Sequence, residues 1–326
     1  MAERPMNRPV DRDHDLDTAE AVVEAPHDGL RADRYVSEVL DLFPRSQLKT
    51  REVRILVNGR PVKPSRNVHE GELVEVEYGP VPLPDLEPED IPLSVIFENR
   101  ELLIIDKPQG MVVHPAQGNY SGTLAHAVLH HVAGLERDFE PESLRPGIVH
   151  RLDKDTSGII VVAKSADAHE EISRQFRERA VHKTYVAITK GTPRPPMGSV
   201  EGFIRRDPHN RKRFAHDPEQ GKPAYTGYRV LRSFADHAVV VLHPHTGRTH
   251  QLRVHMRQLG HPILGDPLYA RHSGRFPEAT LMLHALSLRF TPPGETGPRV
   301  FTASLPPRFA ETIDALIRDR EGRPRR

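Results

Sequence analysis

Residues 80–93, PVPLPDLEPEDIPL, restrict the possible folds of this 326-residue chain more than any other stretch. They contain five prolines and four acidic residues. Proline has no amide hydrogen for a helix or a central strand and its ring fixes φ, so the stretch must run extended. It predicts a linker between a small domain at residues 28–79 and a larger domain at residues 94–318, and the chain is long enough for both.

The two ends of the chain lack the apolar periodicity of folded elements. The first 25 residues hold seven acidic and three basic residues, and the last eight include four arginines. Such polar segments bury too little apolar surface to fold. We therefore expect disordered tails at residues 1–27 and 319–326. The acidic first tail leaves the rest of the chain mildly basic, which is compatible with an anionic partner.

Composition also restricts the setting in which the protein works. There is no cysteine, which excludes disulfides and thiolate metal sites and suits a reducing compartment. No apolar run approaches the roughly 20 residues that a membrane span requires, and the first residues have no signal-peptide pattern. We expect a cytoplasmic monomer that does not bind membranes and has no obligatory protein partner.

The small domain has the pattern of a compact α+β module. Apolar residues at helical spacing follow Leu30, two short runs flank the Asn58-Gly59 turn, and EGELVEVEY alternates as a strand does. Between Leu30 and Glu70 nine arginines and lysines face five acidic residues. This basic surface is equally compatible with simple solvation and with RNA binding.

The large domain alternates strand and helix patterns. Strands are expected within 94–106 (a hairpin), 157–165, 183–190, 225–234 and 237–246, and helices within 122–134, 166–180 and 248–260. The strands at 225–234 and 237–246 are expected to form a second hairpin. Because hairpins outnumber crossovers, we predict an α+β fold with a mixed, largely antiparallel sheet flanked by helices.

Three charged stretches of the large domain are candidates for chemistry or binding. The loop HRLDKDTS places Asp153 and Asp155 just before a strand, although spacing alone favours a turn whose aspartates bond nearby amides. Four histidines between residues 243 and 255 lack metal-ligand spacing, so we expect no metal site. Residues 203–216 carry five basic residues and one acid, which fits either an exposed hairpin tip or a finger that grips phosphates.

Five motifs, taken in chain order, resemble those of the RluA/RluD family of RNA pseudouridine synthases. They are IDKPQGMVVHPAQGNYSGTLAHAVLHH at 105–131, GIVHRLDKDTSGIIVVAKS at 147–165, HKTYVAI at 182–188, HTGRTHQLRVHM at 245–256 and LGHPILGDPLY at 259–269. HRLD followed by TSG is a specific signal, and five concordant motifs make chance implausible. Residues 30–78 in turn resemble the S4 RNA-binding module that RluC and RluD types carry ahead of the catalytic domain.

The resemblance implies the pseudouridine synthase fold and an isomerase that converts uridine to pseudouridine without a cofactor, in large-subunit (23S) ribosomal RNA. By position in the motifs it implies Asp153 as the catalytic aspartate, Tyr185 as the family tyrosine and Arg248 as the basic partner. It also implies Leu283 as a pocket residue and Arg151 as an arginine that helps to displace the target nucleotide.

The implied chemistry suits these residue types. A carboxylate must be ionised to act as a nucleophile, and a nearby guanidinium offsets the rise in pKa that burial causes. Tyr185 would contact the base and take part in removing the C5 proton. The target nucleotide must leave its stack, which requires compensating phosphate contacts. We assign these contacts to basic residues of the small domain and of the finger: Arg45, Lys49, Arg51, Arg54, Arg205, Arg206, Arg211, Lys212 and Arg213.

Two other functions are compatible with parts of the sequence. A non-catalytic RNA-binding factor for ribosome assembly could keep the fold, although intact Asp153, Tyr185 and Arg248 argue against it. A glycoside hydrolase that uses Asp153 and Asp155 is disfavoured, because residues so close in one loop rarely hold carboxyl groups on both sides of a sugar bond. The resemblance leaves open which uridines are modified, whether tRNA is also a substrate, whether the RNA is free or in an assembling subunit, and whether Asp153 attacks the base or the ribose.

Overall fold

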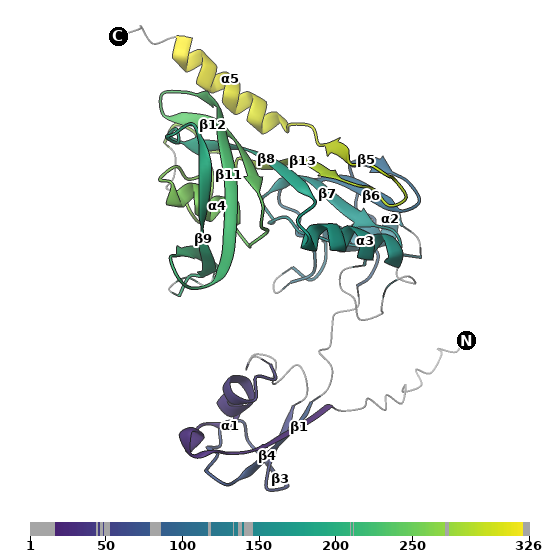
Figure 1. The fold of residues 1–326 in the computed structure, drawn as a ribbon, viewed down its shortest axis with the longest axis vertical. Coiled ribbons are helices and arrows are strands. Elements are labelled where there is room, and N and C mark those ends of the chain that lie inside the picture. The colour runs from purple at the N-terminus through teal and green to yellow at the C-terminus, as the bar shows by residue number, and fades with distance from the viewer. Residues whose placement is uncertain are drawn as a thin grey trace, which may run out of the picture. The chain divides into compact units, whose positions relative to one another are not determined.

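The computed structural model divides the chain into two compact units, residues 1–84 and 85–326 (Figure 1). It describes residues 17–43, 45, 48, 53–78, 86–116, 119–132, 134–135, 139, 146–208, 210, 212–270 and 274–321. The boundary between the units falls inside the stretch predicted as a linker. That linker was expected to reach residue 93, whereas Leu86 and Leu93 pack against a core of the larger unit.

The smaller unit is a four-stranded antiparallel sheet with a short helical segment packed on it. The strand order is β1 (Asp17–Val22), β4 (Leu73–Tyr78), β2 (Arg54–Val57) and β3 (Arg60–Val62). The helical segment comprises η1 (Ala25–His27), α1 (Ala32–Arg34) and the π-helical turn η2 (Tyr35–Val39), whose Tyr35 and Val36 are buried. Asn58 and Gly59 both have positive φ, 52° and 72°, so they form the tight turn expected between β2 and β3.

The prediction that residues 1–27 form a disordered tail is wrong for its last part. Residues 17–22 form β1, which pairs with β4 in a register that joins Asp17 to Tyr78 and Val22 to Leu73. The strand lies at the edge of the sheet, and its inward positions hold only the small residues Ala19 and Ala21. Its alternation is therefore too weak to stand out against the surrounding acidic residues.

The larger unit is built on a ten-stranded sheet. The main path runs in the order β10 (Phe214–Asp217), β9 (Met197–Arg206), β11 (Lys222–Ser233), β12 (His237–Pro244), β8 (His182–Lys190), β13 (Leu283–Phe290), β7 (Ser157–Ala163), β6 (Leu102–Lys107) and β5 (Val95–Glu98). The remaining strand, β14 (Arg299–Thr302), pairs with β13. Among the strands that the structure describes, only β7 and β13 pair in parallel. The sheet is thus mixed and largely antiparallel, as predicted.

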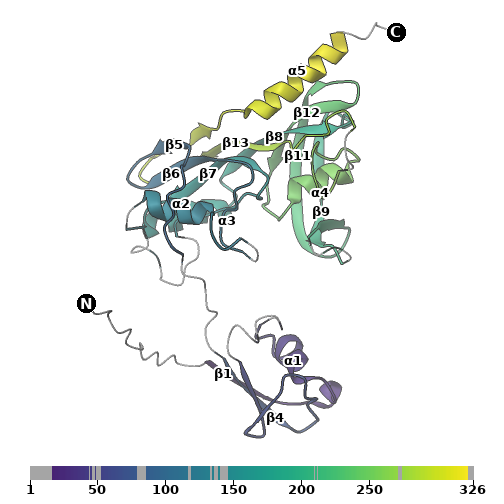
Figure 2. The ribbon, with the colours of Figure 1, turned by 180° about the vertical axis from the view of Figure 1, so that it is seen from behind.

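Four helices accompany this sheet (Figures 1 and 2), and the buried apolar residues of the unit form two large cores. The helices are α2 (Leu124–His131), α3 (Ala166–Arg177), α4 (Gln251–Gln258) and α5 (Pro307–Glu321). One core surrounds β6 and β7 and includes Leu103 and Ile160, and the other surrounds β8 and β12 and includes Val240 and Phe309. The unit thus has two halves, one built around β6 and β7 and the other around β8 and β12. Tyr185 packs against both cores, so it lies where these two halves meet.

The parallel contact between β7 and β13 depends on a glycine. Gly158 has φ +114°, and a Cβ at this position would lie 2.2 Å from the carbonyl oxygen of Ala285. Only a residue without a side chain allows the two backbones to approach so closely. The contact fixes the start of β7, and with it the loop that carries Asp153, against the strand that begins at Leu283. Within the described residues, no helix is both long and apolar enough to cross a membrane.

Candidate active site

A cavity of about 460 Å³ opens where the two halves of the larger unit meet. Its walls come from the loop before β7, the end of α3, strands β8 and β13, the turn after β12 and helix α4. All five residues predicted for the catalytic site and the pocket line this one cavity: Asp153, Tyr185, Arg248, Arg151 and Leu283. Its volume is in the range of sites for small molecules and single nucleotides.

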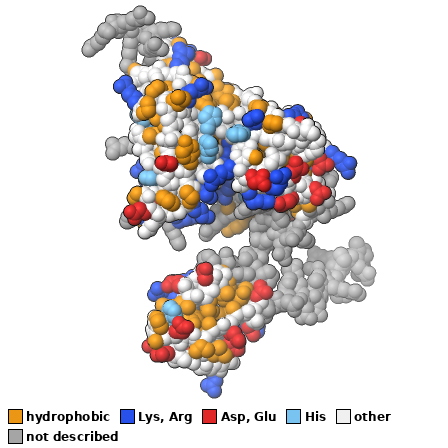
Figure 3. All heavy atoms as spheres, viewed as in Figure 1, with side chains coloured by type: hydrophobic (Ala, Val, Ile, Leu, Met, Phe, Trp, Pro, Cys, Tyr) orange, Lys and Arg blue, Asp and Glu red, His pale blue; other side chains and the backbone are white. Residues whose placement is uncertain are grey.

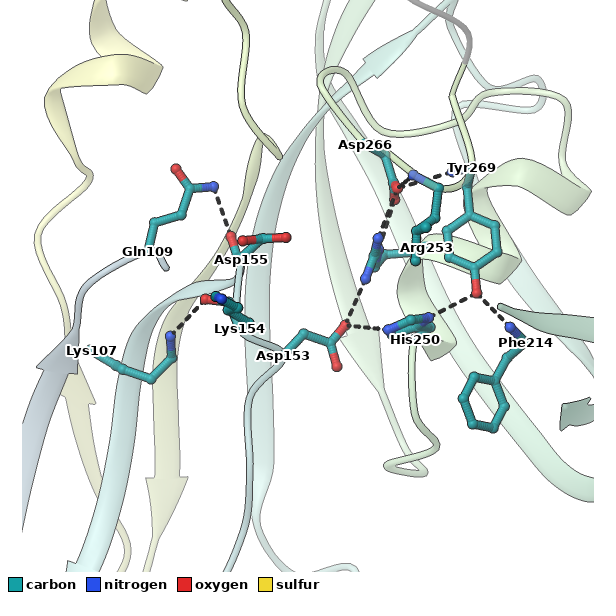
Figure 4. Close-up of polar contacts among 11 residues, drawn as sticks. Lys107, Gln109, Asp153, Lys154, Asp155, Phe214, His250, Arg253, Asp266 and Tyr269 are labelled. Atoms are coloured by element: carbon teal, nitrogen blue, oxygen red, sulfur yellow. Dashed lines mark hydrogen bonds and ion pairs between the residues drawn. The ribbon is translucent and has the colours of Figure 1, made fainter. Parts of the chain in front are cut away.

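Asp153 lies at the wall of the cavity with 20% of its side chain exposed. Its Oδ2 atom lies 3.3 Å from Nη1 of Arg253 and 3.9 Å from Nε2 of His250 (Figure 4). Arg253 is almost fully buried and donates two further hydrogen bonds, from Nε and Nη2, to the two oxygens of Asp266 at 2.7 and 2.8 Å. Burial alone would lower the pKa of Arg253, but Asp266 and Asp153 raise it above its ordinary value. The guanidinium is therefore a permanent positive charge beside Asp153.

The prediction that Arg248 is the basic partner of Asp153 is wrong in its geometry. Nε of Arg248 donates to the carbonyl oxygen of Pro223 at 3.0 Å, and the arginine that contacts Asp153 is Arg253. The helix expected to begin at Arg248 begins at Gln251, after His250, which adopts the left-handed conformation with φ 56° and ψ 16°. This later start places Arg253 in the first turn of α4, where it meets Asp153.

Tyr185 lies near the middle of β8, opposite Leu242 of β12 and Ala285 of β13. Burial, and then the charge of Asp153, raise the pKa of Tyr185 well above its ordinary value. The phenol therefore keeps its proton at neutral pH. Leu283, at the start of β13, is 3% exposed and contributes an apolar patch to the cavity wall.

Comparison with known proteins agrees with this site. Residues 101–258 match the family described as RNA pseudouridylate synthase. The chain is 40% identical over 286 residues to the ribosomal large subunit pseudouridine synthase D of Borreliella burgdorferi, an alignment that covers 86% of this chain and 87% of that relative. This chain belongs to the RNA pseudouridine synthase family. It is an isomerase of RNA uridines, as the sequence motifs implied.

Other relatives of the synthase support the same assignment. The protein of the same name from Pasteurella multocida is 36% identical, with 93% of this chain and 96% of that one covered. Among solved structures, human RNA pseudouridylate synthase domain containing 4 is 28% identical with a TM-score of 0.54, and the match covers 69% of this chain and 93% of that one. The fold predicted for the larger unit is thus confirmed.

The side chain of Lys107 holds the loop that carries the two aspartates of the synthase, through hydrogen bonds to main-chain carbonyl oxygens. Nζ of Lys107 donates to the carbonyl oxygens of Lys154, Pro108 and Met111, at 3.2, 2.8 and 2.9 Å. Lys107 is fully buried, and this burial lowers its pKa to about 8, with a partial offset from the charges of Asp153 and Asp155. Lys107 belongs to the motif at 105–131, but the sequence alone indicates no such role for it.

Asp155 differs from Asp153 in its surroundings. It does not belong to the cavity wall, and its carbonyl oxygen accepts a hydrogen bond from Nε2 of Gln109 at 2.8 Å. The amide of Thr156 donates to the carbonyl oxygen of Asp153 at 3.1 Å, which closes a turn between the two aspartates. The turn directs only the first of them into the cavity.

The rim of the cavity is cationic, and part of this rim was missed in the sequence. Besides Arg151 and Arg248, it includes Arg177, Arg179 and Lys183. Figure 3 shows Lys and Arg side chains, with histidines beside them, gathered between the two halves of the larger unit. Burial, and then the charge of Arg179, lower the pKa of Lys183 to about 8. Such a rim suits the phosphates of an RNA strand.

The predicted basic finger is the hairpin of β9 and β10, in which Arg206 pairs with Phe214 in register. Lys212 and Arg213 lie in its turn, while Arg205 forms an ion pair with Asp217 at 2.7 Å. In the smaller unit Arg54 is exposed at the start of β2, and Arg45 is bonded to Asp33. Three other predicted RNA-binding residues lie outside the described part of the chain: Lys49, Arg51 and Arg211.

The four histidines of residues 243–255 lie in different surroundings. His255 is buried and its Nδ1 contacts the hydroxyl of Thr226 at 2.9 Å, whereas His250 faces Asp153. Within the described residues, no three His, Asp or Glu side chains come together as a group that could hold a metal ion.

Proposed function

We propose that this synthase modifies uridines of large-subunit ribosomal RNA in the cytoplasm, as a monomer, with Asp153 as its nucleophile. One observation carries the choice of nucleophile: a partly exposed carboxylate in the cavity wall, held beside a buried guanidinium. The choice of substrate is supported by relatives from Borreliella burgdorferi and Pasteurella multocida, which are named for the large ribosomal subunit.

Asp153 starts the reaction as an ionised carboxylate. The neighbouring Arg253 favours this charged form and fixes the direction of the carboxylate. Attack on C1′ of the ribose displaces N1 and forms an ester with Asp153, whereas attack on the pyrimidine ring forms an adduct from which the N1–C1′ bond then breaks. In either case the base turns, a C5–C1′ bond forms and the bond to Asp153 breaks, which restores the carboxylate. The hydrogen at C5 is then lost and N1 gains a proton. The product is an isomer of the substrate, so the reaction uses no redox partner and no energy source.

Tyr185 contacts the uracil ring from the centre of the cavity wall. Its raised pKa keeps the hydroxyl protonated in the free enzyme, so at the start of the reaction it can donate a hydrogen bond but cannot accept the C5 proton. Leu283, which lines the same cavity, gives the base an apolar surface.

Cationic surfaces hold the RNA while the target uridine leaves its stack. Unstacking a nucleotide costs a few kcal/mol, which phosphate and pocket contacts offset. In the larger unit these contacts come from the rim around Arg151, Arg179 and Lys183 and from the β9–β10 finger. The smaller unit serves as an S4-like module, a role supported by its basic composition and its exposed Arg54.

Tritium release from ribosomal RNA labelled at C5 of uridine tests this function. The native protein is compared with Asp153→Asn and Asp155→Asn, on free large-subunit RNA and on subunit precursors. We expect release by the native protein and by Asp155→Asn, because Asp155 lies outside the cavity wall, and none by Asp153→Asn. Both variants change one charge in the same loop, so they are matched controls for each other.

Two outcomes would contradict the proposal. Release by Asp153→Asn at the native rate would mean that another group is the nucleophile. Tight, salt-sensitive binding of both RNA substrates without any release by the native protein would favour the non-catalytic assembly factor instead.

A further inference from the structure

A chain of hydrogen bonds leads from the finger to the imidazole beside Asp153 (Figure 4). The hydroxyl oxygen of Tyr269 accepts the amide hydrogen of Phe214 at 2.7 Å and lies 2.8 Å from Nδ1 of His250. Since the amide can only donate, the hydroxyl hydrogen is available for Nδ1. A neutral imidazole that accepts at Nδ1 carries its hydrogen on Nε2, and Nε2 is the atom that lies 3.9 Å from Oδ2 of Asp153.

The backbone and two aromatic rings hold the imidazole of His250 in this orientation. The left-handed conformation of His250 is unfavourable for a residue with a side chain. Its ring meets Phe214 and Tyr269 edge to face, with centroids 5.5 and 5.6 Å apart. Strained non-glycine conformations are concentrated at functional sites, because the surroundings must compensate for them.

Burial keeps the ring of His250 neutral, against the charge of Asp153. Burial lowers its pKa, and the charged groups that face it are Asp153 and Asp266, which raise the pKa, and Arg253 and Arg151, which lower it. The net shift is downward, so the ring is uncharged at neutral pH and has one nitrogen to donate and one to accept.

Tyr269 also contacts Arg253, the other side chain that faces Asp153. The guanidinium of Arg253 lies over its ring at 5.1 Å from the centroid, and its amide donates to Oδ1 of Asp266 at 3.0 Å. One side chain therefore contacts both the arginine and the histidine that face Oδ2 of Asp153. Both of those groups face the same carboxylate oxygen, Oδ2.

We propose that His250 is a positioning residue for Asp153, with an Nε2–H directed at the carboxylate by the Tyr269 hydroxyl, which the finger in turn holds through the amide of Phe214. This inference rests on the proposed role of Asp153. The separation of 3.9 Å shortens to a hydrogen bond when RNA binds, as catalytic contacts often do in the complex. RNA that moves the finger thereby changes the position of the nucleophile.

Nitrogen NMR of protein with ¹⁵N-labelled histidine tests the arrangement without any substrate. In the native protein we expect His250 to have hydrogen on Nε2 and none on Nδ1. Tyr269→Phe keeps the ring but removes the hydroxyl, so a mixture of the two tautomers is expected. Asp153→Asn removes the carboxylate charge and lowers the pKa of His250 further. A native His250 with hydrogen on Nδ1, or with nitrogen shifts unchanged in both variants, would overturn the proposal.

Kinetics then separate positioning from RNA binding. We expect Tyr269→Phe to lower kcat roughly tenfold, the effect of one ordinary hydrogen bond, with KM within about twofold of native. His250→Gln, which retains an N–H donor near the position of Nε2, should keep more activity than His250→Ala. A rise in KM with native kcat would overturn the proposal in favour of a simple RNA contact. Absence of activity in the native protein would instead contradict the proposed substrate, and the NMR result would still decide the arrangement.

Discussion

Nη1 of Arg253 lies 3.3 Å from Oδ2 of Asp153, and this contact exists because a second carboxylate holds the other side of the guanidinium. Asp266, whose side chain is completely buried, accepts from Nε and Nη2. The planar guanidinium is fixed by these two bonds, which leaves Nη1 directed at Asp153. The direction of the guanidinium beside Asp153 is thus set by Asp266, a residue that does not line the cavity.

Substitution of Arg253 should therefore lower kcat, whereas substitution of Arg248 should not. Arg253→Lys keeps the charge but loses the two-bond fork to Asp266, so the charge beside Asp153 is displaced and we expect a loss of roughly a hundredfold in kcat. Arg248→Gln is the matched control, and a higher KM with nearly native kcat is expected from its place on the rim. Steady-state tritium release gives kcat and KM for each variant and so distinguishes Arg253→Lys from Arg248→Gln. The opposite pattern would mean that Arg248 approaches Asp153 when RNA is bound.

Lys107 makes the stability of the larger unit depend on pH above neutrality. Its pKa is about 8 in the folded protein and about 10.5 in the unfolded chain, so between these values the unfolded state binds more protons. The contribution of Lys107 to the free energy of unfolding should then rise with pH, by at most about 1.4 kcal/mol per unit between pH 8 and 10.5. The measurement is urea unfolding of the native protein and Lys107→Met at pH 7 and 9.5. A difference between the two proteins that stays constant with pH would contradict the prediction.

The parts of the structure that the sequence predicted are those set by local pattern. The hairpins of the large domain follow from short apolar runs with turns between them, and the Asn58-Gly59 turn needs only the positive φ that both residues adopt. Motif order was enough to predict that Asp153 and Tyr185 belong to one site. Both were placed by their position in the motifs, without knowledge of the helix that faces them.

The parts that the sequence did not predict depend on contacts between distant residues. Arg248 was assigned to Asp153 by its position in a motif, whereas the structure pairs Asp153 with Arg253. The start of α4 is displaced by the left-handed conformation of His250, which has no signature in apolar periodicity. Lys107 was overlooked because a fully buried lysine is rare and its partners are main-chain carbonyls. β1 was missed because its register is set by β4, more than 50 residues away in the chain.

The affinity of the synthase for RNA should fall as pH rises through about 8, because of Lys183. Its lowered pKa means that Lys183 loses its charge in this range, and with it one cation of the cavity rim disappears. We expect kcat/KM, which reports the ionisation of the free enzyme, to decrease between pH 7 and 8.5. Lys183→Arg stays charged and should flatten this part of the profile. The same decrease in Lys183→Arg would assign the titration to another group.

Binding through the β9–β10 finger should appear in the salt dependence of RNA affinity. Lys212 is exposed in the turn of the finger and Arg213 is half-buried beside it. Each cation that contacts a phosphate releases counterions, so Lys212→Gln and Arg213→Gln should each reduce the slope of log K against log salt by about 1. Arg100→Gln is the matched control, because Arg100 is exposed in the turn between β5 and β6, at the opposite end of the strand order from β10. Filter binding to large-subunit RNA over a range of salt concentrations measures these slopes. Equal slopes for the finger variants and the control would show that RNA does not contact this turn, and that the phosphates lie on the cavity rim instead.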